Sequence, residues 1–233
     1  MSSPTPGVLF DLDGTLVDTN YLHTLAWSRA FRDVGEWVPM NAIHRLVGMG
    51  GDQLVVSLLG REEPRAEQAR ARRYAELVGE AAAFPGAAAL LAAVHRAGVA
   101  TVLATSSPSR EVDALVEVLA PGDALDAVTT KSDVASSKPA PELFVKAMAQ
   151  AGLDPRLVLA VGDSVWDVEA ARATGIGCVA VESGGFSRHE LSEAGALQVY
   201  RDVAELGATL ETGPLAPLLA AGRLATTGTG PMP

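Results

Sequence analysis

The chain has few cysteines, few histidines and a shortage of positive charge. Only one of its 233 residues is a cysteine, Cys178, which excludes an intrachain disulfide framework and is typical of a reducing compartment such as the cytoplasm. The four histidines have no metal-binding spacing, which argues against a zinc site. Lys and Arg number 18 against 28 Asp and Glu, and the net charge of −10 argues against nucleic acid as a partner.

The sequence also lacks a long apolar run. No uninterrupted stretch approaches the roughly 18 residues that a membrane span requires, and we find no secretion signal. The alanine-rich stretch 81–93 is broken by Pro85 and Gly86. We therefore expect a soluble, cytoplasmic protein without a membrane partner, and the acidic surface favours a monomer. Hydrophobic residues make up 48% of the chain, enough for a sizeable core.

Short apolar runs alternate with segments of helical periodicity over most of the chain. The apolar runs predict strands at residues 8–11, 100–105, 127–130, 158–162, 178–181 and 198–200. The periodic segments predict helices at residues 85–97, 110–119, 141–151 and 165–174. This alternation predicts an α/β fold with a Rossmann-like parallel sheet that helices cover on both faces.

One region departs from the alternation and predicts a separate domain. Residues 19–83 contain no strand-like run, and helices are expected at 19–34, 40–47, 51–59 and 63–83. We interpret this insert as an all-helical cap that could exclude water and select the substrate, with residues 1–18 and 84–212 forming the α/β core. The last segment, 213–233, is rich in Gly, Pro and Thr and is predicted to be a disordered tail.

Two acids directly follow the first predicted strand. Asp11 and Asp13 stand two residues apart, and Gly14 then allows the chain to turn away. A turn with an aspartate cap would have the same composition, because Asp-Gly pairs are common in turns. In open α/β sheets, however, ligands bind at the carboxyl edge of the strands, and crowded carboxylates there need a cation or a proton. The pair therefore indicates a metal-assisted reaction.

Three further segments are predicted to reach the same edge of the sheet. Residues 105–107 (TSS) close the second core strand with hydroxyl groups, and Lys138 precedes a helix. Asp163 ends a later strand, and Asp167 follows it on the same face of the next helix. Four acids, a lysine and hydroxyl groups suit Mg²⁺, which prefers oxygen ligands, and they suit phosphoryl transfer to an aspartate.

This arrangement resembles the haloacid dehalogenase-like phosphohydrolase superfamily, in its branch with a helical cap inserted after the first strand. The resemblance extends from about residue 8 to residue 206. It rests on the motif DLDGT at 11–15, Thr105, the pair Lys138 and Pro139, and the motif GDSVWD at 162–167.

The resemblance implies a role for each acid of the first motif. Asp11 would attack the phosphoryl group and form an aspartyl-phosphate. Asp13 would protonate the leaving alcohol and then activate water, while its main-chain carbonyl contacts Mg²⁺. An acid at position 13 also implies a phosphatase, because the true dehalogenases of the superfamily lack this acid and use no metal.

The resemblance implies binding roles for the later motifs. Thr105 and Lys138 would hold the phosphoryl oxygens together with the neighbouring Ser106. Asp163 would bind Mg²⁺ directly, and Asp167 would act through a bound water. With Asp11 and Asp13, these two acids complete the expected metal site.

The cap offers fewer signals. His23 and Trp27 stand four residues apart, a spacing shared with the β-phosphoglucomutase branch and some phosphatases. His23 could hydrogen-bond Asp13 and contact substrate, or could equally belong to a packed helix face. That branch carries a phosphate-binding arginine where this chain has Gly51, and an acid where it has Gly162. Both departures favour hydrolysis over phosphate transfer between positions of a sugar.

Other cap residues are weaker candidates for substrate contact. Gly48 and Met49 are expected in a loop that faces the active site. Arg45 is a candidate substrate ligand, whereas Arg70 lies in a run of arginines that favours a solvated surface.

The leading functional hypothesis is a Mg²⁺-dependent phosphatase acting on a small phosphorylated metabolite, such as phosphoglycolate or a sugar phosphate. One alternative is a β-phosphoglucomutase-like phosphotransferase. The other is a non-catalytic module that binds phosphate or a partner, which the presence of both a nucleophile and an acid/base disfavours.

Overall fold

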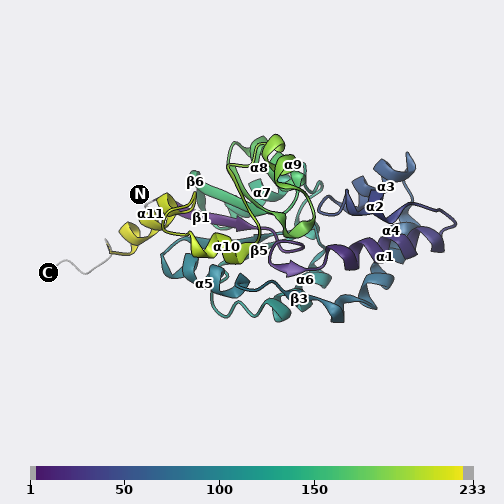
Figure 1. Cartoon of the computed structure of the whole chain (residues 1–233), viewed down its shortest axis with the longest axis horizontal. Helices are drawn as coiled ribbons and strands as arrows, with labels where there is room; N and C mark the ends of the chain where they lie inside the picture. Colours follow the sequence, from purple (N-terminus) through teal and green to yellow (C-terminus); the bar gives the residue numbers. More distant parts are fainter. Residues whose placement is uncertain (1–3, 228–233) are drawn as a thin grey trace.

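Six parallel strands form the central sheet of the computed structural model, which describes residues 4–227 (Figure 1). The strands are β1 (Thr5–Phe10), β4 (Ala100–Ala104), β5 (Ala127–Thr129), β6 (Leu153–Gly162), β7 (Gly177–Val181) and β8 (Gln198–Tyr200). Their order across the sheet is β5-β4-β1-β6-β7-β8, and every neighbouring pair is parallel. The predicted parallel α/β sheet is confirmed, although β6 begins earlier than expected.

Helices cover both faces of the sheet because side chains alternate along each strand. Val8 and Phe10 of β1 pack on one face, and Leu9 packs on the other, all fully buried. The first face is covered by α5 (Ala87–Arg96), α6 (Ser109–Leu119), α10 (Val203–Ala208) and α11 (Ala216–Thr227). The second is covered by α7 (Glu142–Gln150), α8 (Val165–Thr174) and α9 (Arg188–Ala194).

The strand order brings the functional segments together. β1 lies between β4 and β6, with Phe10 opposite Leu103 on one side and Val161 on the other. The backbone continues this register past the strand ends, because the Asp11 amide donates to the Val161 carbonyl at 2.9 Å. The residues that follow β1, β4 and β6 therefore meet at one edge of the sheet.

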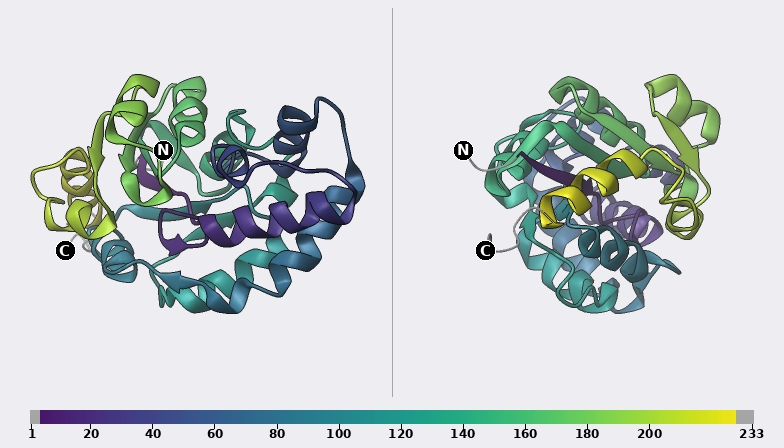
Figure 2. Two further views of the ribbon diagram at one scale, coloured as in Figure 1. Left: turned by 45° about the vertical axis from the view of Figure 1, so that its right-hand side comes forward. Right: turned by 90° about the vertical axis from the view of Figure 1, so that its left-hand side faces the viewer.

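Four helices form the insert at the end of the molecule opposite α11 (Figure 1). They are α1 (Asn20–Asp33), α2 (Met40–His44), α3 (Gly51–Leu59) and α4 (Pro64–Ala75), with α1 and α4 side by side (Figure 2). The insert has its own apolar cluster, in which Phe31, Ile43 and Leu54 are buried. The all-helical cap is confirmed, whereas its exact limits at residues 19 and 83 stay a prediction.

A short ribbon joins the cap to the core and corrects the expected helix at 63–83. That helix ends at Ala75 and is followed by a 3-10 turn (Val78–Glu80) and β3 (Ala82–Ala83). β3 pairs antiparallel with β2 (Val17–Asp18). The alanines of this segment have high helix propensity, so its sequence resembles a helix, but pairing with β2 takes precedence over that preference.

The prediction of a disordered tail at 213–233 is wrong for its described part. Residues 216–227 form α11, and Leu215, Leu218 and Leu219 are buried in the core cluster next to β1. These leucines recur at helical spacing, and most of the helix consists of Ala, Leu and Arg, which are strong helix formers, so the Gly, Pro and Thr content of the segment was a misleading signal. Residues 228–233 lie outside the described part.

Within residues 4–227, no helix has the length and apolar character that a membrane crossing requires.

Candidate active site

Three acids and one lysine form a buried cluster at the carboxyl edge of the sheet. Each of Asp11, Asp163 and Asp167 offers a carboxylate oxygen, and these oxygens lie within 4.8 Å of one another. The Lys138 Nζ donates to the Asp11 carboxylate and, at 2.8 Å, to Asp167. All four side chains are almost completely buried. The structure thus brings together residues from three separate segments, as the sequence predicted.

Local geometry holds the two later acids in place. The Thr15 hydroxyl and the Asn20 amide donate to Asp163 at 2.8 and 2.9 Å. Asp167 forms a capping box with Ser164 at the start of α8. A Cβ on Gly162 would lie 2.3 Å from the Asp167 Cγ, so only glycine leaves room for this carboxylate.

The cluster carries more negative than positive charge. Burial raises the pKa of Asp11 well above its usual value. The positive charge of Lys138 lowers this pKa, whereas repulsion by Asp167, Asp163 and Asp13 raises it further. Burial and the neighbouring Asp167 also raise the pKa of Asp163, to about 7. Burial disfavours the charge of Lys138, but Asp11 and Asp167 raise its pKa overall. These oxygen ligands and their surplus of negative charge fit a hard divalent cation.

Asp13 lies in contrasting surroundings. Its carboxylate accepts hydrogen bonds from the hydroxyls of Thr19 and Ser107, both at 2.7 Å, and of Thr105 at 3.1 Å. The His23 Nε2 lies 2.8 Å from the same carboxylate. Burial by itself raises the pKa of Asp13, but His23 and the donated hydrogen bonds lower it below the usual range. Its side chain is not part of the three-acid group, and the role of its main-chain carbonyl stays a prediction.

A chain of contacts continues from Asp13 into the cap. The Arg70 Nη2 lies 2.5 Å from the His23 Nδ1. The Arg70 Nη1 donates to both carboxylate oxygens of Glu111, at 2.6 and 2.7 Å. Because a guanidinium only donates, His23 Nδ1 accepts and its Nε2 carries the proton toward Asp13. The contact expected between His23 and Asp13 is therefore present. The surface interpretation of Arg70 is wrong, because α4 turns this side chain toward Glu111 on α6.

Hydroxyl groups line the approach to Asp11. The loop after β4 is tightened by a 3.0 Å hydrogen bond from the Ser107 amide to the Thr105 hydroxyl. The Ser106 hydroxyl is buried and has no hydrogen-bond partner within the described residues. A buried hydroxyl without a partner is costly unless a ligand satisfies it, which suits a phosphoryl oxygen.

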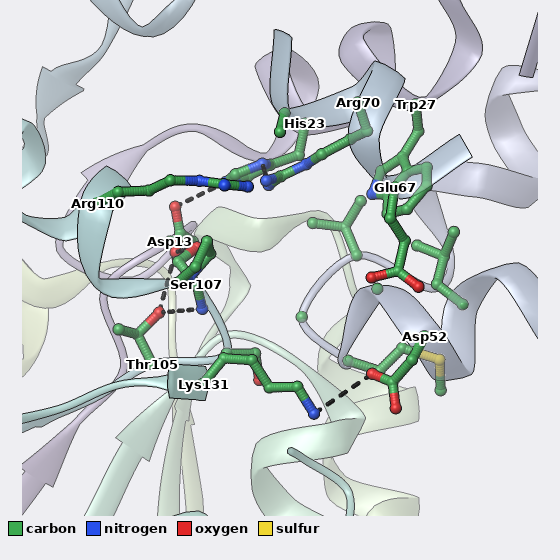
Figure 3. Close-up of a pocket in the computed structure, with 18 of the residues that line it drawn as sticks. Asp13, His23, Trp27, Asp52, Glu67, Arg70, Thr105, Ser107, Arg110 and Lys131 are labelled. Atoms are coloured by element: carbon green, nitrogen blue, oxygen red, sulfur yellow. Dashed lines mark hydrogen bonds and ion pairs between the residues drawn. The ribbon is translucent and has the colours of Figure 1, made fainter. Parts of the chain in front are cut away.

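A cavity of about 670 Å³ lies between cap and core above these groups (Figure 3). Gly48 and Met49 line it, as expected of the cap loop, and so does Trp27. Arg45 does not line it. This side chain pairs with Glu190 on α9 and lies over the Phe186 ring, 4.2 Å from the ring centroid.

Several charged residues line the cavity but were not predicted from the sequence to belong to the site. Figure 3 shows Asp52 and Glu67 on one side of the cavity, with Asp13, Thr105 and Ser107 on the other. Lys131 reaches Asp52 from the core, with 3.4 Å between Nζ and the carboxylate. Ser107 adjoins the recognised Thr105, whereas no local motif marks Asp52, Glu67 or Lys131.

Known proteins share this architecture. A family model for a haloacid dehalogenase-like hydrolase matches residues 5–175. A phosphoglycolate phosphatase from Rhodospirillum rubrum is 33% identical over 215 residues, covering 86% of this chain and 88% of that protein. The protein CbbY from Cereibacter sphaeroides is 32% identical over 216 residues, covering 86% of this chain and 93% of that protein. The crystal structure of a hydrolase from Pseudomonas syringae has a TM-score of 0.84 at 32% identity, covering 89% of this chain and 98% of that chain.

The fold and the site thus define a hydrolase with a Rossmann-like parallel sheet and a helical cap. The chain belongs to the haloacid dehalogenase-like hydrolase family. The resemblance seen in its motifs is confirmed, and so is the prediction that the protein is a hydrolytic enzyme.

Proposed function

We propose that this protein is a Mg²⁺-dependent phosphatase that hydrolyses a small organic phosphate monoester through an aspartyl-phosphate on Asp11. The observation that carries the proposal is the different environment of two neighbouring acids. Asp11 faces Lys138 and two further carboxylates, whereas Asp13 faces hydroxyls and His23. The phosphoglycolate phosphatase among the relatives supports the same type of substrate. A monomer in the cytoplasm is part of the proposal.

Asp11, Asp163 and Asp167 would hold Mg²⁺, with Asp167 acting through water and the Asp13 carbonyl as a further oxygen ligand. The surplus of buried negative charge supports this assignment. When bound, the ion would neutralise charge on the phosphoryl oxygens and on Asp11.

Asp11 would act as the nucleophile. Its carboxylate oxygen forms a bond to phosphorus while the bond from phosphorus to the leaving oxygen breaks. Lys138 and the hydroxyls of Thr105 and Ser106 would hold the phosphoryl oxygens during the transfer. A proton from Asp13 neutralises the leaving alkoxide.

Asp13 would then act as the general base. It removes a proton from water, the water oxygen attacks phosphorus, and the bond to Asp11 breaks to release phosphate. The hydrogen bonds around Asp13 favour its carboxylate, the form that this second step requires. If the Thr105 hydroxyl donates to a phosphoryl oxygen instead, Asp13 loses one of its hydrogen bonds. Its protonated form, which the first step requires, is then favoured.

Replacement of the nucleophile tests this mechanism. We expect Asp11→Asn to lower p-nitrophenyl phosphate hydrolysis by at least about a thousandfold with an unchanged circular dichroism spectrum. Asp123→Asn, at an exposed core loop, is the matched control and should retain activity. Persistent turnover by Asp11→Asn would reject the mechanism.

Removal of divalent cations tests the metal requirement. Activity should disappear on chelation and return with Mg²⁺, and metal-independent hydrolysis would reject the metal requirement.

The phosphotransferase alternative receives less support. Residue 51 of the cap is glycine, so the cap has no arginine at this point for a second phosphate. A Cβ there would lie 3.0 Å from the Trp27 indole, so a larger side chain would also need the indole to shift. Incubation with a β-hexose 1-phosphate and a bisphosphate primer compares the two activities. We expect free phosphate to form faster than the 6-phosphate isomer, and the reverse order would favour the alternative.

A further inference from the structure

Gln53 connects the cap to residues 134–141, the Lys138 loop. It lies in α3, and its Nε2 donates a hydrogen bond to the Ser137 carbonyl at 3.0 Å. The Gln53 side chain is half-buried and does not line the cavity between cap and core. Contact with a bound substrate therefore does not account for this side chain, whereas contact with the Lys138 loop does.

The backbone of the same cap segment also lies against the Lys138 loop. The Gly50 amide donates to the Lys138 carbonyl, with 3.4 Å between the two atoms. A Cβ on Gly50 would lie 3.1 Å from the Ser137 Cβ, which shows how closely the two backbones approach. Two residues after Gly50, Asp52 forms its ion pair with Lys131, which precedes the loop in the chain (Figure 3). The cap thus contacts the loop through one side chain and one amide, beside this ion pair.

The Lys138 loop has no helix or strand of its own. It lies between a 3-10 turn (Lys131–Asp133) and α7, and the Ala140 amide closes a turn within it by donating to the Ser137 carbonyl at 3.0 Å. Ser137 and Lys138 are nevertheless 0% exposed. Where backbone groups lack a regular ladder, single hydrogen bonds determine their position. The position of the Lys138 backbone therefore depends in part on donors from the cap.

We propose that Gln53 is a positioning residue for Lys138, which it holds through the Ser137 carbonyl. The inference rests on the phosphatase function proposed above and adds to it a residue that acts on phosphoryl transfer from outside the cavity. The Lys138 Nζ donates to both Asp11 and Asp167, so a displaced backbone would disturb both contacts. Stabilisation of a phosphoryl group requires donors that are already in place, and small displacements lower the rate.

Gln53→Met tests this role, because it removes the amide donor and keeps the length of the side chain. With Mg²⁺, kcat/KM should fall about fivefold, and equally for p-nitrophenyl phosphate and phenyl phosphate, since Lys138 acts on the phosphoryl group and not on the leaving alcohol. The inhibition constant of inorganic phosphate should rise by the same factor, because this ion has no leaving group. An unchanged inhibition constant, or a loss confined to one ester, would overturn the proposal.

Two further variants separate the hydrogen bond from packing. Gln53→Lys places a donor at the same position and should recover at least half of the loss. Asn41→Leu removes an amide from an exposed position of α2 that does not line the cavity, and it should leave every constant unchanged. Equal losses in Gln53→Met and Gln53→Lys, or a similar loss in Asn41→Leu, would show that cap packing is responsible and would overturn the assignment.

Hydrogen exchange tests the inference without reference to activity. In Gln53→Met, the backbone amides of the Lys138 loop should exchange about fivefold faster than in the wild type, while the amides of β1 keep their rates. Unchanged exchange in the loop would overturn the inference even in an active enzyme. Failure of the phosphatase proposal is distinguishable, because the wild type would then hydrolyse neither ester while the exchange result still decides the role of Gln53.

Discussion

Asp11 and Asp13 are separated by one residue, yet their carboxyl groups face opposite electrostatic surroundings. The pKa of Asp11 is raised by burial and by repulsion from neighbouring acids, whereas the pKa of Asp13 is lowered by His23 and hydroxyl donors that outweigh its burial. Along a strand, alternate positions share a face, so the sequence alone would place the two acids together. The chain leaves the strand after Phe10, and this departure separates their environments.

The acid cluster predicts how stability responds to pH and Mg²⁺. The pKa of Asp163 is about 7 in the folded protein, above its ordinary 3.8, so the metal-free folded state binds more protons than the unfolded state between these values. The unfolding free energy without divalent cations should therefore fall as pH rises from about 4 to 7. Mg²⁺ at about 100 times its dissociation constant should add about 2.7 kcal/mol and flatten this dependence at high pH.

Urea unfolding at a series of pH values, with EDTA or with Mg²⁺, measures both effects. Asp163→Asn is the control. It should lose part of the pH slope, because the pKa of Asp11 is also raised, and most of the response to Mg²⁺. A metal-free unfolding free energy that rises across this pH range would contradict the prediction.

The position of Gly162 predicts a steric requirement of the proposed metal site. A methyl group at this position would lie 2.3 Å from the Asp167 Cγ, so Gly162→Ala must displace that carboxylate. We expect the Mg²⁺ concentration for half-maximal activity to rise about tenfold and stability to fall by about 1–3 kcal/mol. An acid at position 162, as in the β-phosphoglucomutase branch, would require a different arrangement of Asp167.

Gly207→Ala provides the comparison for Gly162→Ala. Gly207 lies in α10, and a Cβ at this position would meet no atom within 4 Å outside its own helical turn, so alanine there should be neutral or stabilise by up to about 1 kcal/mol. A Mg²⁺ titration and thermal unfolding of both variants measure the difference. Equal Mg²⁺ requirements would show that Asp167 does not depend on Gly162.

At the level of elements, α11 shows how helix-forming residues and burial together decide structure in a segment predicted to be a disordered tail. Leu219 is 2% exposed and packs in the cluster beside β1. Leu219→Ala should lower the unfolding free energy by about 2–5 kcal/mol. Val145→Ala, on the exposed face of α7, should change it by less than about 0.5 kcal/mol. Urea unfolding compares the two, and equal effects would mean that α11 contributes no packing.

Most core elements could be predicted because each strand is an apolar run that ends in a polar motif. The helices at 51–59 and 165–174 and the strand at 198–200 agree with the structure at both ends. β2 and β3 could not be predicted, because two residues are too few for a pattern and their pairing joins positions far apart in sequence.

The candidate site was predictable to the same extent and for a similar reason. Asp11, Lys138 and Asp163 stand in local motifs, and the parallel sheet brings these motifs to one edge. Arg70 has no such motif, because its contacts with Glu111 and His23 depend on how α4 is rotated against the core. That rotation is decided by packing between distant segments rather than by spacing within the helix.

At the level of the whole molecule, charged contacts of different exposure join the cap to the core. Arg70 and Glu111 form a largely buried pair, with side-chain exposures of 12% and 8%. Arg45 and Glu190 form an exposed pair, at 44% and 37%. The Arg70 side chain of the first pair also contacts His23, which contacts Asp13, so the contact between cap and core and the position of His23 are physically linked.

This difference predicts unequal effects of breaking the two pairs. Glu111→Ala leaves the buried Arg70 guanidinium without its carboxylate and should lower the unfolding free energy by about 3–5 kcal/mol. Arg45→Ala removes an exposed pair, and its unfolding free energy should fall by at most about 1 kcal/mol.

The same two variants should also differ in activity. Because Arg70 holds His23, Glu111→Ala should lower kcat/KM for p-nitrophenyl phosphate by about tenfold or more. Arg45→Ala should leave KM unchanged, since this side chain does not line the cavity. Urea unfolding and steady-state kinetics of both variants provide the measurements. Similar losses of kcat/KM in the two variants would show that cap closure in general, rather than the contact between Arg70 and His23, supports catalysis.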